Sequence, residues 1–235
     1  LYTHPENGAE QRFAIVEWDK DSRYALLSHS YGDKTEFLSL DTQDLARSKN
    51  ITTGLGVEAK KIIYSKAGAG TVYIWTTSDE LRRADLGAMT LSGPLVEHVS
   101  DMSMNDDTAV LYATNSDEQG VRTVGYVSSG ATVAKTVKSY RDAADKTLHY
   151  ASMVYYGDRY HAIAVNDTIQ LYQGSVPGSA DMASISLKSI GSMSMIGGAT
   201  YLGFSPGDHR FVYAAQGQTI ATYDLELNAA STQTL

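Results

Sequence analysis

Two carboxylates stand near the predicted starts of inner strands, and this placement suits hydrolysis of a glycosidic bond. Glu58 and Asp101 hold these positions, whereas most other acidic residues fall in predicted outer turns. Glycosidases use two carboxyl groups about 5–10 Å apart, one as the acid and the other as the base or nucleophile. A polysaccharide-active enzyme is therefore one hypothesis, and it requires these two side chains to converge.

The other residues that could do chemistry complete no catalytic or metal-binding pattern. The acidic turns at Asp19–Ser22 and Asn105–Asp107 lack the alternating oxygens and closing carboxylate of a calcium loop. Gly68–Gly70 precedes a predicted strand, whereas a phosphate-binding loop needs a helix. No two histidines have metal-ligand spacing on a common strand face, and the six are His4, His29, His98, His149, His161 and His209. We predict no catalytic residue, no cofactor and no metal site.

Composition limits the kind of partner. The chain has 235 residues, 27 acidic against 19 basic, and its net charge of −8 disfavours binding to nucleic-acid phosphates. It has no run of about 18 apolar residues, so we expect no segment that inserts into a membrane. The chain has no cysteine, which fits a cytosolic protein and equally a secreted protein from a cell that makes few disulfides. Tyrosine is abundant, and strand propensity explains it better than a binding surface does.

The elements that must position these residues are repeated hairpins. Each copy ends one strand, turns over residues rich in Asp, Gly or Lys, and starts an apolar strand: Trp18–Leu27, Tyr64–Trp75, Met104–Ala113, Tyr155–Val165 and Phe204–Ala215. Third strands are expected at Phe37–Asp41, Leu81–Leu86, Val121–Val127, Ile169–Gly174 and Ile220–Glu226. Weaker fourth strands are expected at Ala46–Ile51, Pro94–Val99, Thr132–Tyr140, Ala183–Ser189 and Ser231–Leu235. Four strands per repeat predict the blades of a β-propeller.

We therefore predict an all-β chain folded as a β-propeller of four-stranded antiparallel blades. Residues 1–11 are expected to be a linker or the remnant of an upstream blade, and residues 12–235 the propeller. The repeats lie near 12–56, 57–99, 100–146, 147–195 and 196–235, as a five-bladed ring or part of a six- or seven-bladed one. The first two strands of each repeat are the most apolar, so we expect them to be buried on both faces. Single helical turns are expected at Asp44–Ser48 and Asp142–Lys146.

The turns FSPGDHRFVYAA, WDKDSRYALL and YYGDRYHAIAV, with the strand ends LRRADL and IATYDLE, resemble TolB-like and dipeptidyl-peptidase-N-like propeller repeats. The Trp-Asp and Gly-His signatures of WD40 repeats are absent. A closer resemblance is to propellers that follow a PEGA domain in surface proteins of candidate-phylum bacteria (Saccharibacteria). The resemblance implies an extracellular or cell-envelope location, with a membrane anchor and the PEGA domain upstream of Leu1. A cytoplasmic location is the alternative.

Together these observations favour a non-catalytic cell-surface propeller that binds a protein or a glycan at its axial face. A structural scaffold of an envelope assembly is the second hypothesis, and the polysaccharide-active enzyme is the third. Binding is expected on the loops that enter the innermost strands, which are Thr53–Lys60, Leu95–Met102, Ala143–His149 and Ser192–Ala199. The methionines near these loops are expected to pack in the core, namely Met102, Met104, Met193 and Met195.

Overall fold

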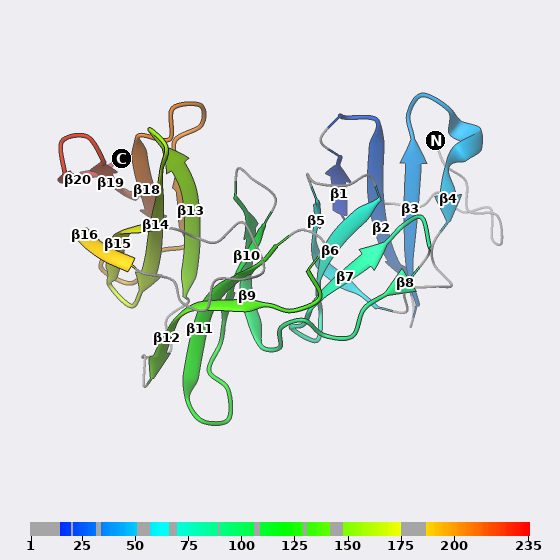
Figure 1. Ribbon diagram of the computed structural model, residues 1–235, viewed down its shortest axis with the longest axis horizontal. Helices are drawn as coiled ribbons and strands as arrows, with labels where there is room; N and C mark the ends of the chain where they lie inside the picture. The colour runs from blue at the N-terminus through cyan, green and yellow to red at the C-terminus, as the bar shows by residue number, and fades with distance from the viewer. Residues whose placement is uncertain are drawn as a thin grey trace. The chain divides into compact units, whose positions relative to one another are not determined.

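The computed structural model shows five four-stranded antiparallel sheets, and in each sheet the strands lie in chain order (Figure 1). It describes residues 15–19, 21–31, 34–50, 57–65, 70–88, 90–105, 109–128, 131–141, 148–174 and 187–235. The predicted all-β fold of four-stranded antiparallel blades is confirmed. The chain divides into two compact units, residues 1–97 and residues 98–235.

The first unit holds two sheets. Sheet 1 consists of β1 (Ile15–Trp18), β2 (Tyr24–Tyr31), β3 (Lys34–Asp41) and β4 (Lys49–Asn50). Sheet 2 consists of β5 (Ala59–Tyr64), β6 (Thr71–Thr76), β7 (Leu81–Asp85) and β8 (Thr90–Leu91). The core of this unit joins the two sheets and includes Leu26 and Phe37 from sheet 1 and Ile62, Val72 and Ile74 from sheet 2.

The second unit holds three sheets. Sheet 3 consists of β9 (Val99–Met104), β10 (Val110–Thr114), β11 (Val121–Val127) and β12 (Lys135–Arg141). Sheet 4 consists of β13 (His149–Tyr155), β14 (Asp158–Val165), β15 (Thr168–Gly174) and β16 (Leu187–Ser194). Sheet 5 consists of β17 (Tyr201–Phe204), β18 (Phe211–Gln216), β19 (Thr219–Asp224) and β20 (Ala229–Thr234).

Burial on both faces explains why the second strand of a repeat is so apolar. In β14, Ala162 and Ala164 belong to the core between sheets 4 and 5, whereas Ile163 belongs to the core between sheets 3 and 4. Every residue of β10 is buried, while every residue of the outermost strand β20 is exposed. A strand covered on both faces needs apolar residues at successive positions, and an outer strand does not. The burial expected of the second strands is confirmed in β6, β10 and β14. The burial expected of the first strands is wrong for β1 and β17, which have no buried side chain among those described.

Two hairpin turns show the chemistry that their residues predict. Tyr156 and Gly157 connect β13 to β14 and have φ values of 48° and 84°. Positive φ at both central residues is the geometry of a type I′ turn, which suits the twist of a two-residue hairpin. Gly207 follows Pro206 in the turn between β17 and β18 with φ of 85°, as a type II turn requires at its third residue.

The fourth strands differ most from the prediction. The strand expected at Pro94–Val99 is wrong: β8 lies earlier, at Thr90–Leu91, and Val96 forms only an isolated bridge to Leu81. The strand expected at Ala46–Ile51 begins later, as β4 at Lys49, because a single 3₁₀ turn precedes it at Leu45–Arg47, capped by the Asp44 carboxylate. Ile51 lies outside the described residues. The 3₁₀ turn confirms the helical turn expected at Asp44–Ser48.

Two other predicted elements lie wholly or partly outside the described residues. The helical turn expected at Asp142–Lys146 lies outside the described residues. The fourth strand expected at Ala183–Ser189 is described from Leu187, where β16 begins and continues to Ser194. Within the described residues, no helix has the length and apolar character needed to cross a membrane.

Candidate functional site

The predicted loops at Leu95–Met102 and Ala143–His149 bring one acid–base pair together. Asp101 Oδ2 lies 2.6 Å from His149 Nδ1, and the two side chains are 26% and 12% exposed. The other oxygen of Asp101 accepts a hydrogen bond from the Met102 amide at 2.8 Å. Nearby, the Ser103 hydroxyl donates to the Tyr150 carbonyl at 3.3 Å. These bonds tie β9 to β13, the first strands of sheets 3 and 4.

The two carboxylates considered for hydrolysis have different partners. Asp101 is engaged by His149 in the second unit, whereas Glu58 is exposed in the first unit, where the Thr77 hydroxyl donates to it at 3.5 Å. A histidine held by an aspartate also occurs in nucleophilic catalysis. Here the pair joins two neighbouring strands, so we assign it the role of a clamp between sheets 3 and 4.

Two of the predicted binding loops lie partly outside the described residues. Residues 53–56 and 143–147 are not described. Met102, Met193 and Met195 are buried, which confirms core packing for those three methionines. Within the described part of the chain, no group of three or more His, Cys, Asp or Glu side chains is arranged to hold a metal ion.

Asp and Asn side chains at the start of two of the acidic turns bond to the local backbone. Asp19 Oδ1 accepts from the amides of Arg23 and Tyr24, each at 2.8 Å, and Asn105 Oδ1 accepts from the Ala109 amide at 3.0 Å. These contacts are the Asx-type bonds that the sequence favours for such turns.

A repeated Arg–Asp clamp explains why Asp ends several third strands. Arg23 donates through Nη2 and Nε to Asp41 at 2.8 and 3.3 Å, and Arg210 donates likewise to Asp224 at 2.6 and 3.0 Å. Each carboxylate also accepts two amides of the next turn. The arginine hydrogen bonds lower the pKa of both Asp41 and Asp224 to about 2. In sheet 2, Asp85 caps the corresponding turn by accepting from the Gly87 and Ala88 amides, and Gly70 stands before the second strand, where sheets 1 and 5 have the arginine.

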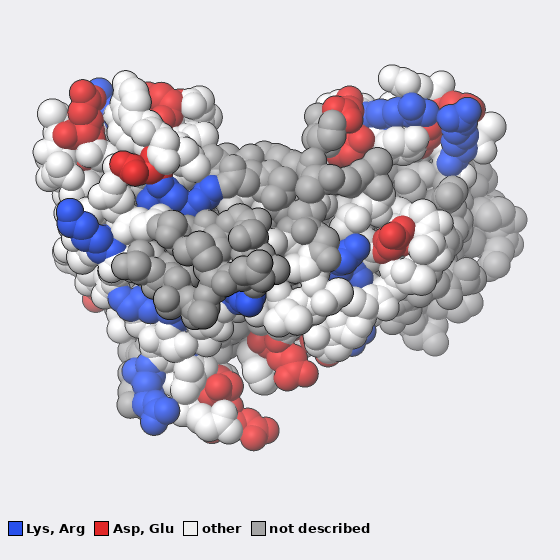
Figure 2. All heavy atoms as spheres, viewed as in Figure 1, with Lys and Arg blue, Asp and Glu red and all other residues white. Residues whose placement is uncertain are grey.

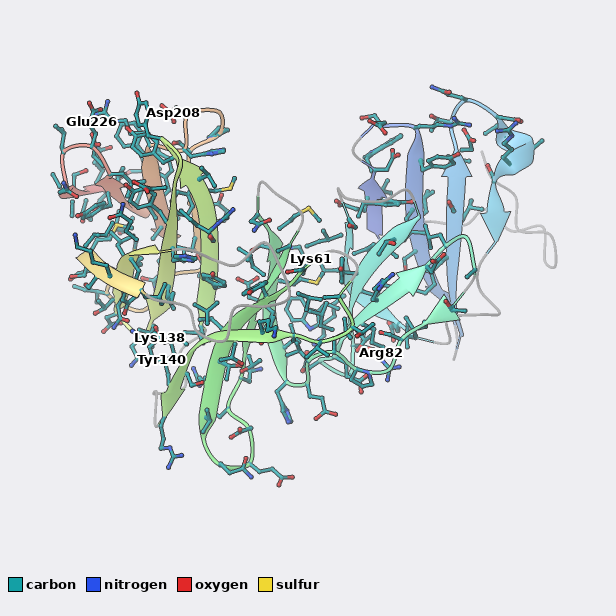
Figure 3. The ribbon with its side chains drawn as sticks, viewed as in Figure 1. Lys61, Arg82, Lys138, Tyr140, Asp208 and Glu226 are labelled. Atoms are coloured by element: carbon teal, nitrogen blue, oxygen red, sulfur yellow. The ribbon has the colours of Figure 1, made fainter. Side chains whose placement is uncertain are left out.

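Three turns of the second unit meet at one end of sheets 4 and 5 and form what we call the turn cluster: Tyr155, Tyr156, Asp208, Arg210, Glu226 and Leu227. Tyr156 is 90% exposed and Leu227 is 68% exposed. The rings of Tyr155 and Tyr156 meet edge to face, with centroids 4.6 Å apart. Figure 3 places the labelled Asp208 and Glu226 together at this end, where Figure 2 shows acidic atoms among uncharged ones.

Hydrogen bonds and ion pairs fix the turns of this cluster. His209 Nδ1 lies 3.0 Å from the Val154 carbonyl, which links the turn before β18 to β13. Arg210 pairs with Glu226 at 2.7 Å while it holds Asp224. The Asp208 carboxylate accepts from the Ser205 hydroxyl and the Arg210 amide, and these hydrogen bonds lower its pKa.

A second group, which we call the lysine cluster, lies between sheets 3 and 4 and consists of Lys138, Tyr140, Gln170 and Tyr172 (Figure 3). Lys138 Nζ hydrogen-bonds to Gln170 Oε1 at 3.2 Å and to the Tyr172 hydroxyl. The same oxygen accepts from the hydroxyls of Tyr172 at 2.6 Å and Tyr140 at 3.2 Å. The ammonium also lies 4.3 Å and 5.4 Å from the ring centroids of Tyr172 and Tyr140. Burial raises the pKa of Tyr140 above its usual value.

A β-bulge aims Lys138 into this cluster. In the pairing of β11 with β12, Lys138 opposes Val124 and Thr136 opposes Gly125, so Val137 is the extra residue. Val124 faces the core between sheets 3 and 4, and Lys138 therefore points toward sheet 4. The sequence gives no signal for this cluster, because residues about 30 positions apart form no common motif.

Five successive four-stranded antiparallel sheets, each in chain order, define a β-propeller architecture. Among solved structures, the β-propeller domain of Cps50 (Swd1) from Myceliophteria thermophila is similar to this chain. The two share 12% sequence identity, with a TM-score of 0.61 over 97% of this chain and 74% of that one. At this identity the similarity shows the fold alone. No protein-family model and no curated protein matches the sequence. The resemblance to TolB-like, dipeptidyl-peptidase-N-like and PEGA-associated propellers therefore stays a prediction.

Proposed function

We propose that this propeller is a non-catalytic module that recognises a protein partner through the turn cluster. The observation that carries the proposal is Tyr156, which is 90% exposed on a two-residue turn. An aromatic ring held out on a fixed turn offers a large contact area at a low cost in conformational entropy. Exposed Leu227 adds a second apolar side chain on another turn of the same cluster.

The charges around these two residues suit the rim of an interface. Arg210 is held by Asp224 and Glu226, and Asp208 is held by backbone and hydroxyl donors. Interfaces typically surround apolar anchors with polar groups that stay partly in contact with water. Such a rim favours a protein with complementary charges. The sheets behind it hold the turns at fixed spacing, as expected of a scaffold for recognition.

The proposed surface differs from the one that the sequence favours. The sequence points to the loops that enter the first strands, whereas the turn cluster lies on the turns that leave the first and third strands. In the predicted loops of the second unit, Asp101 and His149 bond to each other and join the strands β9 and β13.

Partner capture with turn-cluster variants tests this proposal. The immobilised chain and its Tyr156→Ala/Leu227→Ala variant are exposed to extract of the source organism, and bound proteins are quantified by mass spectrometry. We expect partners held by the unaltered chain to fall about tenfold with the double variant, as for hot-spot truncation. Val133→Ala is the matched control, because Val133 is also an exposed apolar residue of the second unit.

Two results contradict the proposal. Equal capture by the double variant and the unaltered chain rules out the turn cluster as the binding surface. Binding to a glycan array that depends on Tyr156 replaces the protein partner with a carbohydrate. Circular dichroism melting of each variant ensures that lost binding is not lost folding.

The cell-surface location is part of the proposal and rests on the sequence resemblance alone. Labelling of intact cells with a membrane-impermeant biotin reagent tests it. We expect the protein to be labelled before lysis if it is displayed outside. Labelling only after lysis contradicts that location and leaves the binding proposal in place.

A further inference from the structure

Lys138 is a half-buried ammonium with a large aromatic and amide environment. It contacts Gln170 Oε1, the Tyr172 hydroxyl and the rings of Tyr140 and Tyr172, all of them formally neutral. Among the ion pairs within the described residues, none includes Lys138. A charge taken partly out of water is costly unless an opposite charge accompanies it. The ammonium of Lys138 therefore offers a binding position for an anion.

The hydrogen bonds of the cluster lead to the same conclusion. Gln170 Oε1 has two lone pairs but lies within reach of three donors, from Lys138, Tyr140 and Tyr172. The ammonium itself carries three N–H donors. The Tyr172 hydroxyl accepts one N–H of Lys138, and Gln170 Oε1 accepts another. One N–H of the ammonium is left for a further acceptor, which a carboxylate would supply in a charge-assisted bond.

The strand that carries Lys138 extends the positive charge. β12 has the sequence KTVKSYR, with three cations and no acidic residue: Lys135, Lys138 and Arg141. It is the edge strand of sheet 3, so its outer backbone groups face no strand of that sheet. Figure 2 shows lysine and arginine atoms over the position that Figure 1 gives β12. An extended segment lying along such an edge can pair its backbone and place its side chains on the lysines.

We propose that Lys138 and its cluster bind the carboxylate of an acidic, extended peptide segment of a partner protein that lies along β12. A peptide fits better than an acidic sugar, because sugars stack on aromatic faces and the ammonium already lies over both tyrosine rings. This site is separate from the turn cluster and does not depend on it. The partner is recognised by its charge and its extended conformation.

Fluorescence anisotropy with a defined probe tests the site. The probe is a fluorescein-labelled peptide of four Thr-Glu repeats, and its Thr-Gln counterpart is the uncharged control. At low salt we expect the full chain to bind the Thr-Glu peptide, and Lys138→Met to weaken binding at least about tenfold, as loss of a charge-assisted bond predicts. Lys188→Met is the matched control, because Lys188 is an exposed lysine on β16 of the same unit.

Gln170→Glu keeps the proposal testable if Lys138→Met fails to fold. The new carboxylate supplies the missing charge inside the chain, so this variant should lose peptide binding and melt at a higher temperature. Tyr156→Ala should bind the peptide normally, which separates this site from the turn cluster.

Four results overturn the inference. Three of them are equal binding of the two peptides by the unaltered chain, unchanged binding by folded Lys138→Met, and binding of oligogalacturonate at Lys138 in preference to the peptide. The last result would replace the peptide by an acidic glycan. No binding of the Thr-Glu peptide by the unaltered chain also overturns it.

Discussion

Each unit places a lysine ammonium against an aromatic ring, but the two ammonium groups have different oxygen partners. In sheet 2, Lys60 Nζ lies 5.4 Å from the ring centroid of Trp75 and 2.5 Å from Asp79 Oδ1. The same carboxylate accepts from the Trp75 indole nitrogen at 3.2 Å. In the lysine cluster, the corresponding oxygen is the amide oxygen of Gln170.

This difference separates a completed structural contact from an open one. The carboxylate of Asp79 neutralises Lys60 within the chain, so that cluster needs nothing from outside. An amide accepts a hydrogen bond but carries no charge, so Lys138 keeps its positive charge available to a ligand. The comparison teaches that a cation over an aromatic ring is not by itself a binding site. Such a cation can bind a ligand only if the chain itself does not supply the counter-ion.

The largest expected effect comes from a clash at Gly125, beside the bulge that aims Lys138. A Cβ atom on Gly125 would lie 2.1 Å from the Lys135 carbonyl oxygen and 2.4 Å from the Tyr112 hydroxyl. Backbone and a packed ring cannot both give way cheaply, so Gly125→Ala should cost about 3 kcal/mol of unfolding free energy. Urea denaturation measures this loss, and binding of the Thr-Glu peptide should fall with it.

Gly93→Ala is the control for that substitution. No atom lies within 4 Å of a Cβ built on Gly93, so the change should alter stability by less than about 0.5 kcal/mol. If Gly125→Ala is as mild as Gly93→Ala, the close approach of β11 and β12 does not hold the bulge. The account of how Lys138 is aimed would then be wrong.

The sequence predicts the strands that are buried on both faces better than it predicts the outer ones. Val121–Val127 matches β11 at both ends, because Gly120 before it and Ser128–Gly130 after it are turn residues that mark its bounds in the sequence. The strand expected at Pro94–Val99 is misplaced, since β8 has only two residues and neither is buried. A short, exposed strand carries no hydrophobic period from which to place it.

The lysine cluster lies beyond sequence reasoning for a different physical reason. Alternation in a strand puts Thr136 and Lys138 on one face, whereas the bulge at Val137 turns them to opposite faces. The packing of sheet 3 on sheet 4 then brings in Gln170 and Tyr172 from about 30 residues away.

The Arg–Asp clamps have a signal in the sequence. Asp41 and Asp224 each end a third strand, and an arginine stands just before the second strand of the same repeat.

A smaller effect concerns His161, a titratable group that sheet 4 keeps neutral. Its Nδ1 lies 2.8 Å from the Tyr150 hydroxyl, and burial lowers its pKa from 6.5 to about 4. Below pH 6.5 the unfolded chain takes up a proton that the folded chain refuses. Stability should therefore fall as the pH drops from 6.5 toward 4, by about 2 kcal/mol over that range.

Denaturation by urea at several pH values measures this dependence. His161→Gln keeps an acceptor for Tyr150 but does not titrate, so the variant should lose the part of the pH dependence that His161 causes. His161 pairs across the strands with Tyr172 of the lysine cluster. A pH dependence identical in both proteins would show that sheet 4 admits the charged imidazole, and that burial there does not penalise a cation.

The smallest expected effect comes from making the first cluster resemble the second. Asp79→Asn leaves Lys60 with an amide oxygen, and asparagine tolerates the positive φ of 59° at this position. Because the pair is partly exposed, the loss of unfolding free energy should be about 0.5 kcal/mol and should vanish in concentrated salt. In a Lys138→Met background, the variant should also gain weak affinity for the Thr-Glu peptide. If Lys60 freed of Asp79 still ignores that peptide, a missing counter-ion is not enough to make a site, and the edge strand β12 must supply the rest of the recognition at Lys138.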